Sequence, residues 1–231
     1  IHQALIDLRD RGVAVLVVQP MAWTAVKAHL IGRQETRLVE VLEERQLTDL
    51  AGAPWILTQL RALAARGRFP VNRADALGLI AGSALVSFDT RRAPRSCAEQ
   101  ALERIAWRLQ TERRRALDSD ALLSILAEVR DRRDFRFDDL SGGLIGCQIL
   151  ASSGEDGVRF TYGAVQSYFA ARYVQKSGRK WAFLEDMTAA LGRYSRVRHW
   201  EGVLIALAGL QESIADHLLK MEYVTNRRCC S

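Results

Sequence analysis

The sequence has few lysines, although it is basic overall. Its 231 residues carry 33 lysines and arginines against 27 aspartates and glutamates, a formal net charge of +6. Only Lys27, Lys176, Lys180 and Lys220 are lysines, so the remaining basic residues are arginines. Because these arginines are interspersed with acidic residues, we interpret them mainly as solvated helix faces. The densest clusters, 91–92 and 113–115, stay candidates for phosphate or partner contacts.

Other absences exclude several protein classes. The four cysteines, Cys97, Cys147, Cys229 and Cys230, form no C-x-x-C pair and have no histidine at ligand spacing, which argues against a zinc site or a disulfide framework. No run approaches the roughly 18 consecutive apolar residues of a membrane span, and the N-terminus lacks the regions of a signal peptide. We therefore expect a globular cytoplasmic protein with no membrane partner and no metal site.

The residues of common catalytic sites are also missing. No glycine precedes a lysine, so no G-x-x-x-x-G-K-[ST] phosphate loop is present. The four histidines are dispersed, and adjacent acidic pairs such as Glu43 and Glu44 do not face each other on a helix. We expect no catalytic residues in this chain and no phosphoryl transfer by the chain alone.

The first 34 residues indicate the edge of an α/β domain. An amphipathic stretch at 1–10 precedes the apolar run 13–18, which ends at Gln19 and Pro20. A short, non-alternating, β-branched run is typical of a strand that is covered on both faces, as in a parallel sheet. Because one such strand cannot form a sheet, we interpret residues 1–34 as a remnant of a domain whose other strands lie upstream.

Residues 35–90 predict a helical domain. Apolar residues recur at helical spacing from Thr36 to about Ala65, with a break at Gly52-Ala53-Pro54, and a further helix follows around 74–88. Proline is tolerated in the first turn of a helix, so Pro54 fits the start of a second helix. The polar, proline-containing stretch 89–96 is the best candidate for a domain boundary.

Residues 97–178 predict a winged-helix domain. Helices are expected at 98–116, from an N-cap at Asp118-Ser119 onward, and near 137–144. A hairpin follows, with one strand at 147–150 and a second at 158–162, where Val158, Phe160 and Tyr162 alternate with polar residues. From Gly163 the period becomes helical, and we expect Phe160, Val165, Tyr168 and Phe169 to be core residues. Three helices, a two-stranded wing and a helix describe a winged-helix arrangement.

The remainder, 179–225, is predicted to be helical and resembles the start of a helical-repeat region. The predicted fold class is therefore mainly α: a helical domain and a winged-helix domain with a small β-hairpin, preceded by one remnant strand of an α/β P-loop domain.

This order of features resembles the NACHT-type members of the STAND class of signal-transducing P-loop NTPases. The first elements that match are the buried strand 13–18 and the Gly52-Ala53-Pro54 turn. The others are the strand 158–162, Val-Arg-Phe-Thr-Tyr, and the helix 166–173, Gln-Ser-Tyr-Phe-Ala-Ala-Arg-Tyr. Arg198-His199-Trp200-Glu201 before an apolar helix is similar to the family's passage into its sensor repeats.

The resemblance implies a signalling switch, with a role such as bacterial-type defence, in which ATP or ADP with Mg²⁺ binds between a P-loop domain and these modules. The implied partners are the upstream P-loop domain, downstream sensor repeats and further copies of the protein on activation. Gly52 and Pro54 would approach the adenine. Tyr162 stands where the family has a phosphate-contacting histidine, and a phenol carries no positive charge at neutral pH. We therefore expect weakened nucleotide sensing at Tyr162, and no tight nucleotide binding by this chain alone.

Two other functions fit parts of the sequence: a winged-helix nucleic-acid-binding regulator and a helical protein-interaction scaffold. The helix expected to enter the major groove begins Phe137-Asp138-Asp139 and offers no Arg, Lys, Asn or Gln to bind base edges. The wing tip, Glu155-Asp156, is acidic as well, and both surfaces would repel phosphates. No specific DNA partner is expected.

Overall fold

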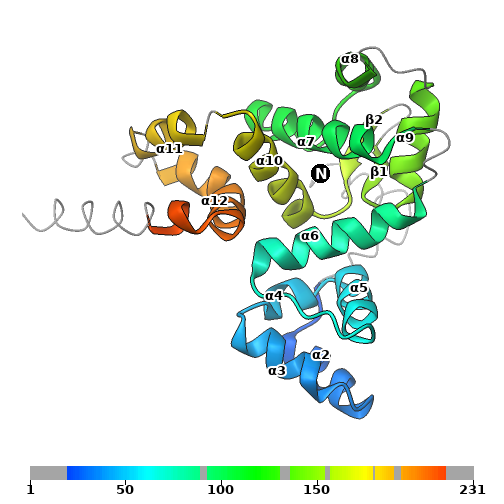
Figure 1. Cartoon of the computed structure of the whole chain (residues 1–231), viewed down its shortest axis with the longest axis vertical. Coiled ribbons are helices and arrows are strands. Elements are labelled where there is room, and N and C mark those ends of the chain that lie inside the picture. The colour runs from blue at the N-terminus through cyan, green and yellow to red at the C-terminus, as the bar shows by residue number, and fades with distance from the viewer. Residues whose placement is uncertain are drawn as a thin grey trace, which may run out of the picture.

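A computed structural model gives the fold of the chain and describes residues 20–88, 93–130, 136–153, 157–178, 180–189 and 194–216. This part of the chain is mainly helical, with one small antiparallel hairpin (Figure 1). None of its helices is both long and apolar enough to cross a membrane. The strand predicted at 13–18, the wing tip and residues 89–92 of the predicted domain boundary lie outside the described residues.

Helices α2 to α5 form one group at the N-terminal end of the described chain. They span Trp23–Gly32, Thr36–Glu44, Thr48–Ala51 and Pro54–Ala64. Helix α2, for which the sequence analysis predicted no element, packs on α3 and α4 and buries Val26 and Leu30 in their core. The predicted boundary between residues 34 and 35 thus falls between two helices that pack on each other.

Helix α6, Arg73–Ala84, lies between this group and the rest of the fold (Figure 1). It begins at Asn72, whose side chain accepts a hydrogen bond from the Asp75 amide, the usual chemistry of a helix N-cap. It contacts α5 on one side and α10 and α12 on the other, and a short 3₁₀ turn, Leu85–Ser87, follows it. Every residue of α6 is buried or half-buried and none is exposed, as expected for a helix with neighbours on both sides.

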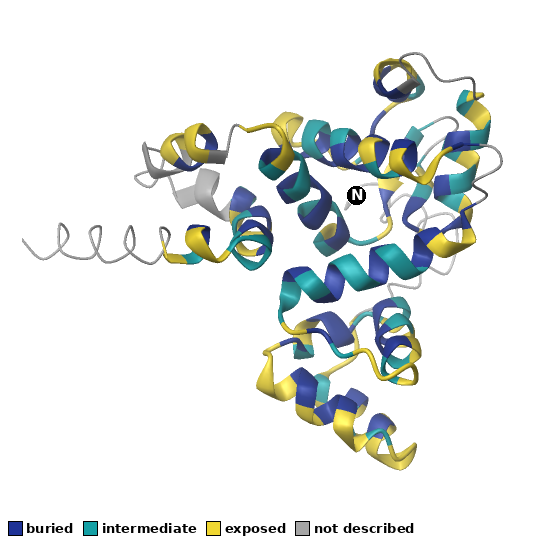
Figure 2. Ribbon diagram, in the orientation of Figure 1, coloured by how far each residue is buried: buried dark blue, intermediate teal, exposed yellow. Residues whose placement is uncertain are grey.

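The next elements run in the order α7, α8, α9, β1, β2 and α10. Their bounds are Arg95–Glu112, Ser119–Arg130, Phe137–Gly146, Leu150–Ser153, Gly157–Phe160 and Gly163–Lys176. Asp118 accepts a hydrogen bond from the Ala121 amide at 2.9 Å, which confirms the predicted N-cap. Helix α10 packs along α7, and Figure 2 colours much of both helices as buried or intermediate.

Both strands of the hairpin differ from their predicted bounds. The first starts at Leu150, whereas Cys147 and Gln148 form the turn that ends α9, with Gln148 at φ 60°. The apolar run that indicated a strand at 147–150 is therefore explained mainly by burial of Cys147 and Ile149 beneath the turn. The second strand ends at Phe160, because Tyr162 is the N-cap of α10.

The core residues predicted in the motif at 158–174 are confirmed. Val158, Phe160, Val165, Tyr168 and Phe169 are all buried, and Arg159 between the first two is exposed. Helices α11, Lys180–Ala189, and α12, Tyr194–Leu210, follow. Helix α12 packs on both α6 and α10, so the helical region predicted after residue 178 is docked on the preceding elements.

Gly157 lies where three chain segments meet. Leu117 and Val158 exchange both backbone hydrogen bonds, each 2.9 Å long, beside the β1–β2 pair. A Cβ atom at Gly157 would lie 2.4 Å from the Ser153 carbonyl oxygen and 2.8 Å from that of Leu117. Because both neighbours are backbone atoms, the segments must separate to admit a methyl group.

We predict that Gly157→Ala lowers the free energy of unfolding by about 1–3 kcal/mol, as overpacking commonly does. Gly142→Ala is the matched control, because Gly142 is an exposed residue of α9 with no atom within 4 Å of an added Cβ. That change should stabilise the protein by up to about 1 kcal/mol through helix propensity. Urea denaturation measures both, and equal midpoints for the two variants would contradict the prediction.

Candidate functional site

The fold brings the predicted nucleotide-contacting residues into one region. Gly52 lies in the turn between α4 and α5, and Pro54 is the exposed first residue of α5. The next residue, Trp55, stacks on Tyr162 with ring centroids 5.0 Å apart and ring planes 12° apart. Residues more than a hundred positions apart in the sequence, at the starts of α5 and α10, therefore lie side by side.

The segment that follows the predicted strand 13–18 borders the same turn. The Met21 amide donates a hydrogen bond to the Gly52 carbonyl oxygen at 2.8 Å. A Cβ atom at Gly52 would lie 3.0 Å from the Met21 carbonyl oxygen and 3.4 Å from the Pro20 side chain. Because this approach leaves little room for a side chain, glycine suits the position. We call the group Pro20, Met21, Gly52, Pro54, Trp55 and Tyr162 the junction site.

The junction site is aromatic and neutral in charge. Tyr162 and Trp55 are both half-buried, and burial raises the pKa of the Tyr162 phenol. At neutral pH the hydroxyl therefore keeps its proton, and it makes no hydrogen bond with any of the described residues. The site offers a planar surface and one neutral donor, without a cation among its own side chains.

A network of charged side chains that the sequence analysis missed joins α7 to α10. Arg172 donates a hydrogen bond to Glu99 at 2.9 Å and forms an ion pair with Glu103 at 3.0 Å, and Lys176 donates a hydrogen bond to Glu103 at 2.7 Å. Glu103 is 4% exposed, so its carboxylate is among the most buried charges described. The Arg172 guanidinium also lies 5.9 Å from the ring centroid of Tyr168. One signal was available in the sequence. Glu99 and Glu103 are spaced i, i+4, and so are Arg172 and Lys176, so each helix carries two like charges on one face.

The charges in this network stabilise one another. Burial alone would raise the pKa of Glu99, but hydrogen bonds and attraction from Arg172 and Arg95 outweigh it and hold the pKa below the ordinary 4.5. Burial of Arg172 lowers its pKa, and the two carboxylates more than reverse that effect. Since every side chain of the network has an oppositely charged partner on the other helix, we interpret the network as a structural contact that holds α7 and α10 together.

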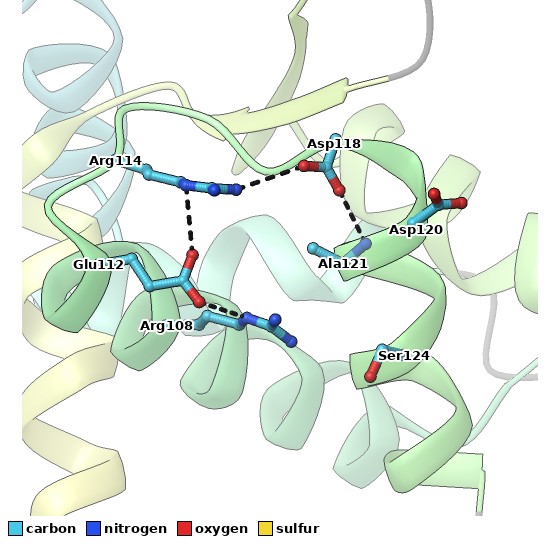
Figure 3. A pocket seen from close by; sticks show the side chains of 7 residues that line it. All are labelled: Arg108, Glu112, Arg114, Asp118, Asp120, Ala121 and Ser124. Atoms are coloured by element: carbon cyan, nitrogen blue, oxygen red, sulfur yellow. Dashed lines mark hydrogen bonds and ion pairs between the residues drawn. The ribbon is translucent and has the colours of Figure 1, made fainter.

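A shallow surface pocket of about 680 Å³ lies where α7 ends and α8 begins (Figure 3). Its charged side chains form a chain of ion pairs: Arg108 to Glu112 at 2.8 Å, Glu112 to Arg114 at 3.4 Å, and Arg114 to Asp118 at 3.3 Å. Asp120, Ala121 and Ser124 complete the lining. The middle arginine of the cluster 113–115 is thus paired with two carboxylates, whose negative charges would repel a phosphate at this position.

A third cluster fixes α12 against α7. His199 and Gln110 each hydrogen-bond the other's backbone carbonyl oxygen at 2.6 Å. Because a carbonyl only accepts, the His199 Nε2 atom carries a proton. Trp107 lies between Tyr173 and Trp200, with centroid distances of 5.3 and 5.4 Å. His199 and Trp200, which the sequence analysis placed at the passage into sensor repeats, therefore anchor α12.

No group of three or more His, Cys, Asp or Glu side chains within the described ranges is arranged to hold a metal ion. Cys97 and Cys147 are buried, and neither forms a disulfide within the described part of the chain. Searches for related proteins returned no matching family model, no matching curated protein and no matching solved structure.

We predict that Glu103→Gln lowers the free energy of unfolding by about 2 kcal/mol, because Arg172 and Lys176 lose a buried opposite charge. The control is Glu128→Gln, which removes a carboxylate that is half-exposed and paired with Arg104 across α7 and α8. Surface pairs of this kind contribute less than about 1 kcal/mol. Thermal unfolding at neutral pH compares the two, and an equal loss would contradict a fastening role for Glu103.

The lowered pKa of Glu99 also predicts a pH dependence. A carboxylate whose pKa is lower in the folded chain than in the unfolded chain stabilises the fold at any pH above its unfolded-state pKa. This contribution is lost as the pH falls through the lower pKa that the group has in the folded state. The stability difference between the wild type and Glu99→Gln should therefore be constant above about pH 5 and shrink below pH 4.5. Urea denaturation from pH 3.5 to 7 measures it. A difference that grows on acidification would show the opposite sign of shift.

Proposed function

We propose that residues 95–176 form a winged-helix domain. The order of elements supports this: helix α7, the paired residue Leu117, helices α8 and α9, then β1 and β2. Leu117, between the first two helices in the sequence, forms an isolated antiparallel bridge with Val158 beside the two-stranded hairpin. A helix, a strand, two helices and a two-stranded wing are the usual succession in winged-helix domains.

We further propose that the chain supplies the helical lid and the winged-helix relay of a NACHT-type STAND switch that responds to ATP and ADP. The observation that carries this proposal is the junction site. The Gly52–Pro54 turn and Tyr162 were singled out separately from the sequence, and they meet through the Trp55–Tyr162 stack. Pro20 and Met21, which follow the predicted strand of the P-loop domain, border the same turn.

The side chains of the junction site fit a nucleotide only in part. The exposed ring of Pro54, at the head of α5, is suited to apolar contact with a base. The Tyr162 hydroxyl can donate one neutral hydrogen bond to a phosphate oxygen. Charge compensation for the phosphates would have to come from the P-loop domain and its Mg²⁺, because the junction site contributes no cation of its own.

The nucleic-acid alternative gains little from the arrangement of α9. Its exposed residues include Asp138, Gly142 and Gly146, so the helix presents a carboxylate and glycines to solvent. Base recognition in the major groove needs donors and acceptors such as Arg, Asn or Gln at these positions. We therefore favour the switch over the nucleic-acid-binding regulator.

The first test concerns Pro54. In the polypeptide that extends this chain upstream through the predicted P-loop domain, Pro54→Ala should weaken ADP binding about three- to tenfold, from loss of apolar contact. Pro94→Ala is the matched control, since Pro94 is also an exposed proline at the start of a helix and lies outside the junction site. Isothermal titration calorimetry measures both. Equal affinity of the two variants, or an upstream sequence without a phosphate loop, would overturn the proposal.

The second test concerns Tyr162. In the same polypeptide, Tyr162→His should tighten ADP binding about tenfold, because hydrogen bonds to charged partners are stronger than neutral ones. The gain should be larger at pH 6 than at pH 8, as the imidazole takes up a proton near pH 6.5. Tyr162→Phe, which cannot donate a hydrogen bond, should bring no gain. Unchanged ADP affinity of Tyr162→His at both pH values would remove Tyr162 from the nucleotide site.

A further inference from the structure

The group α2 to α5 is attached to the rest of the described fold mainly through one helix contact. Its principal helix packing beyond the group is that of α5 on α6. Helix α10 packs along α6, α7 and α12, and α5 is not among its main neighbours. The Trp55–Tyr162 stack therefore joins two parts of the fold that otherwise meet through α6 (Figure 1).

Tyr162 sits where its ring is coupled to two elements. It occupies the link between β2, which ends at Phe160, and α10, which begins at Gly163, with an extended backbone at φ −132° and ψ 126°. On the other side, Trp55 is the second residue of α5. Movement of this strand–helix link or of the start of α5 therefore displaces one ring of the stack. A change in the angle between α5 and α10 would thus separate the rings.

Both rings lie at the margin of the hydrophobic core. Trp55 and Tyr162 are each half-buried and pack against core residues. We call the arrangement in which the start of α5 contacts the start of α10 closed. A stacked aromatic pair raises the equilibrium ratio of closed to open arrangements by about two- to tenfold, beyond the effect of buried area. A bias of that size lets a bound ligand or partner still reverse it. A fully buried pair would only add stability.

We propose that the Trp55–Tyr162 stack is a ligand-independent clamp that holds the start of α5 against the start of α10. This inference rests on the proposed function, whose nucleotide response it regulates: an aromatic contact within the chain takes the place of an ionic contact to a phosphate. The junction site then stays closed in the absence of nucleotide, and Tyr162 contributes through its ring more than through its hydroxyl.

Amide hydrogen exchange of the 231-residue chain without nucleotide tests the clamp. Tyr162→Leu and Trp55→Leu should each speed exchange at 54–58 and 157–166 about three- to tenfold, and Tyr162→Phe should leave it within twofold of the wild type. The double variant Trp55→Leu, Tyr162→Leu should exchange no faster than either single one, because the two rings act through one contact. Tyr162→Phe exchanging as fast as Tyr162→Leu, or independent effects in the double variant, would overturn the clamp.

A second aromatic pair provides a matched control. Trp107 and Tyr173 also stack, at 5.3 Å and 20°, and both are half-buried, but they join α7 to α10 away from the junction site. Tyr173→Leu should leave exchange at 54–58 unchanged. Exchange there that rises as much as in Tyr162→Leu would mean a general loss of stability and would overturn the clamp.

The clamp and the proposed function are tested by separate measurements, so either can be overturned without the other. The exchange measurements contain no nucleotide, so they decide the clamp alone. In the upstream-extended polypeptide, ADP should restore slow exchange at 54–58 in Tyr162→Leu, because bound nucleotide would replace the missing stack. Absence of ADP binding by that polypeptide would overturn the proposed function, whatever the exchange of the nucleotide-free chain.

Discussion

The described fold depends on α6 having close neighbours on two sides. Its approach to α10 is limited at Gly78, where a Cβ atom would lie 2.7 Å from the Tyr168 hydroxyl. Its approach to α12 is limited at Ala74, whose Cβ would lie 2.8 Å from a Cβ added at Gly209. Glycines at these crossings let the helices pack closely enough for one continuous core to extend from α2 past α12.

The position of the junction site follows from that packing. Because α6 fixes α10 through Tyr168, the start of α10 carries Tyr162 to the start of α5, which packs on the other side of α6. The charges of Glu99, Glu103 and Arg172 hold α10 to α7 at the same time. A neutral aromatic contact therefore rests on a framework of close helix crossings and paired charges. Such a contact is well suited to a small conformational bias, because its strength is modest.

The excess of arginine has a structural explanation in this framework. Carboxylates pair with several arginines, among them Arg172, Arg114, Arg108 and Arg61. Arg61, in the last turn of α5, donates from two nitrogen atoms to Glu35, which precedes α3. Burial would raise the pKa of Glu35, but its hydrogen bonds to Arg61, the largest effect, keep that pKa low. Arginine is suited to such pairing by its planar, multiple donors. These ion pairs explain part of the arginine content as helix contacts, although each pair is neutral and so adds nothing to the net charge of +6.

The sequence alone determined the mainly helical class, the N-cap at Asp118 and the buried residues of 158–174, because each depends on local spacing or on local hydrogen bonds. It missed α2, placed the first strand of the hairpin three residues too early and extended the second beyond Phe160. It gave Gly52, Pro54 and Tyr162 as separate candidates whose contact with nucleotide is still a prediction. Only the tertiary structure decided that Trp55 meets Tyr162 and that Arg172 binds Glu103. Those contacts join residues distant in sequence, and the close packing of α6 and α10 sets them, which no local pattern contains.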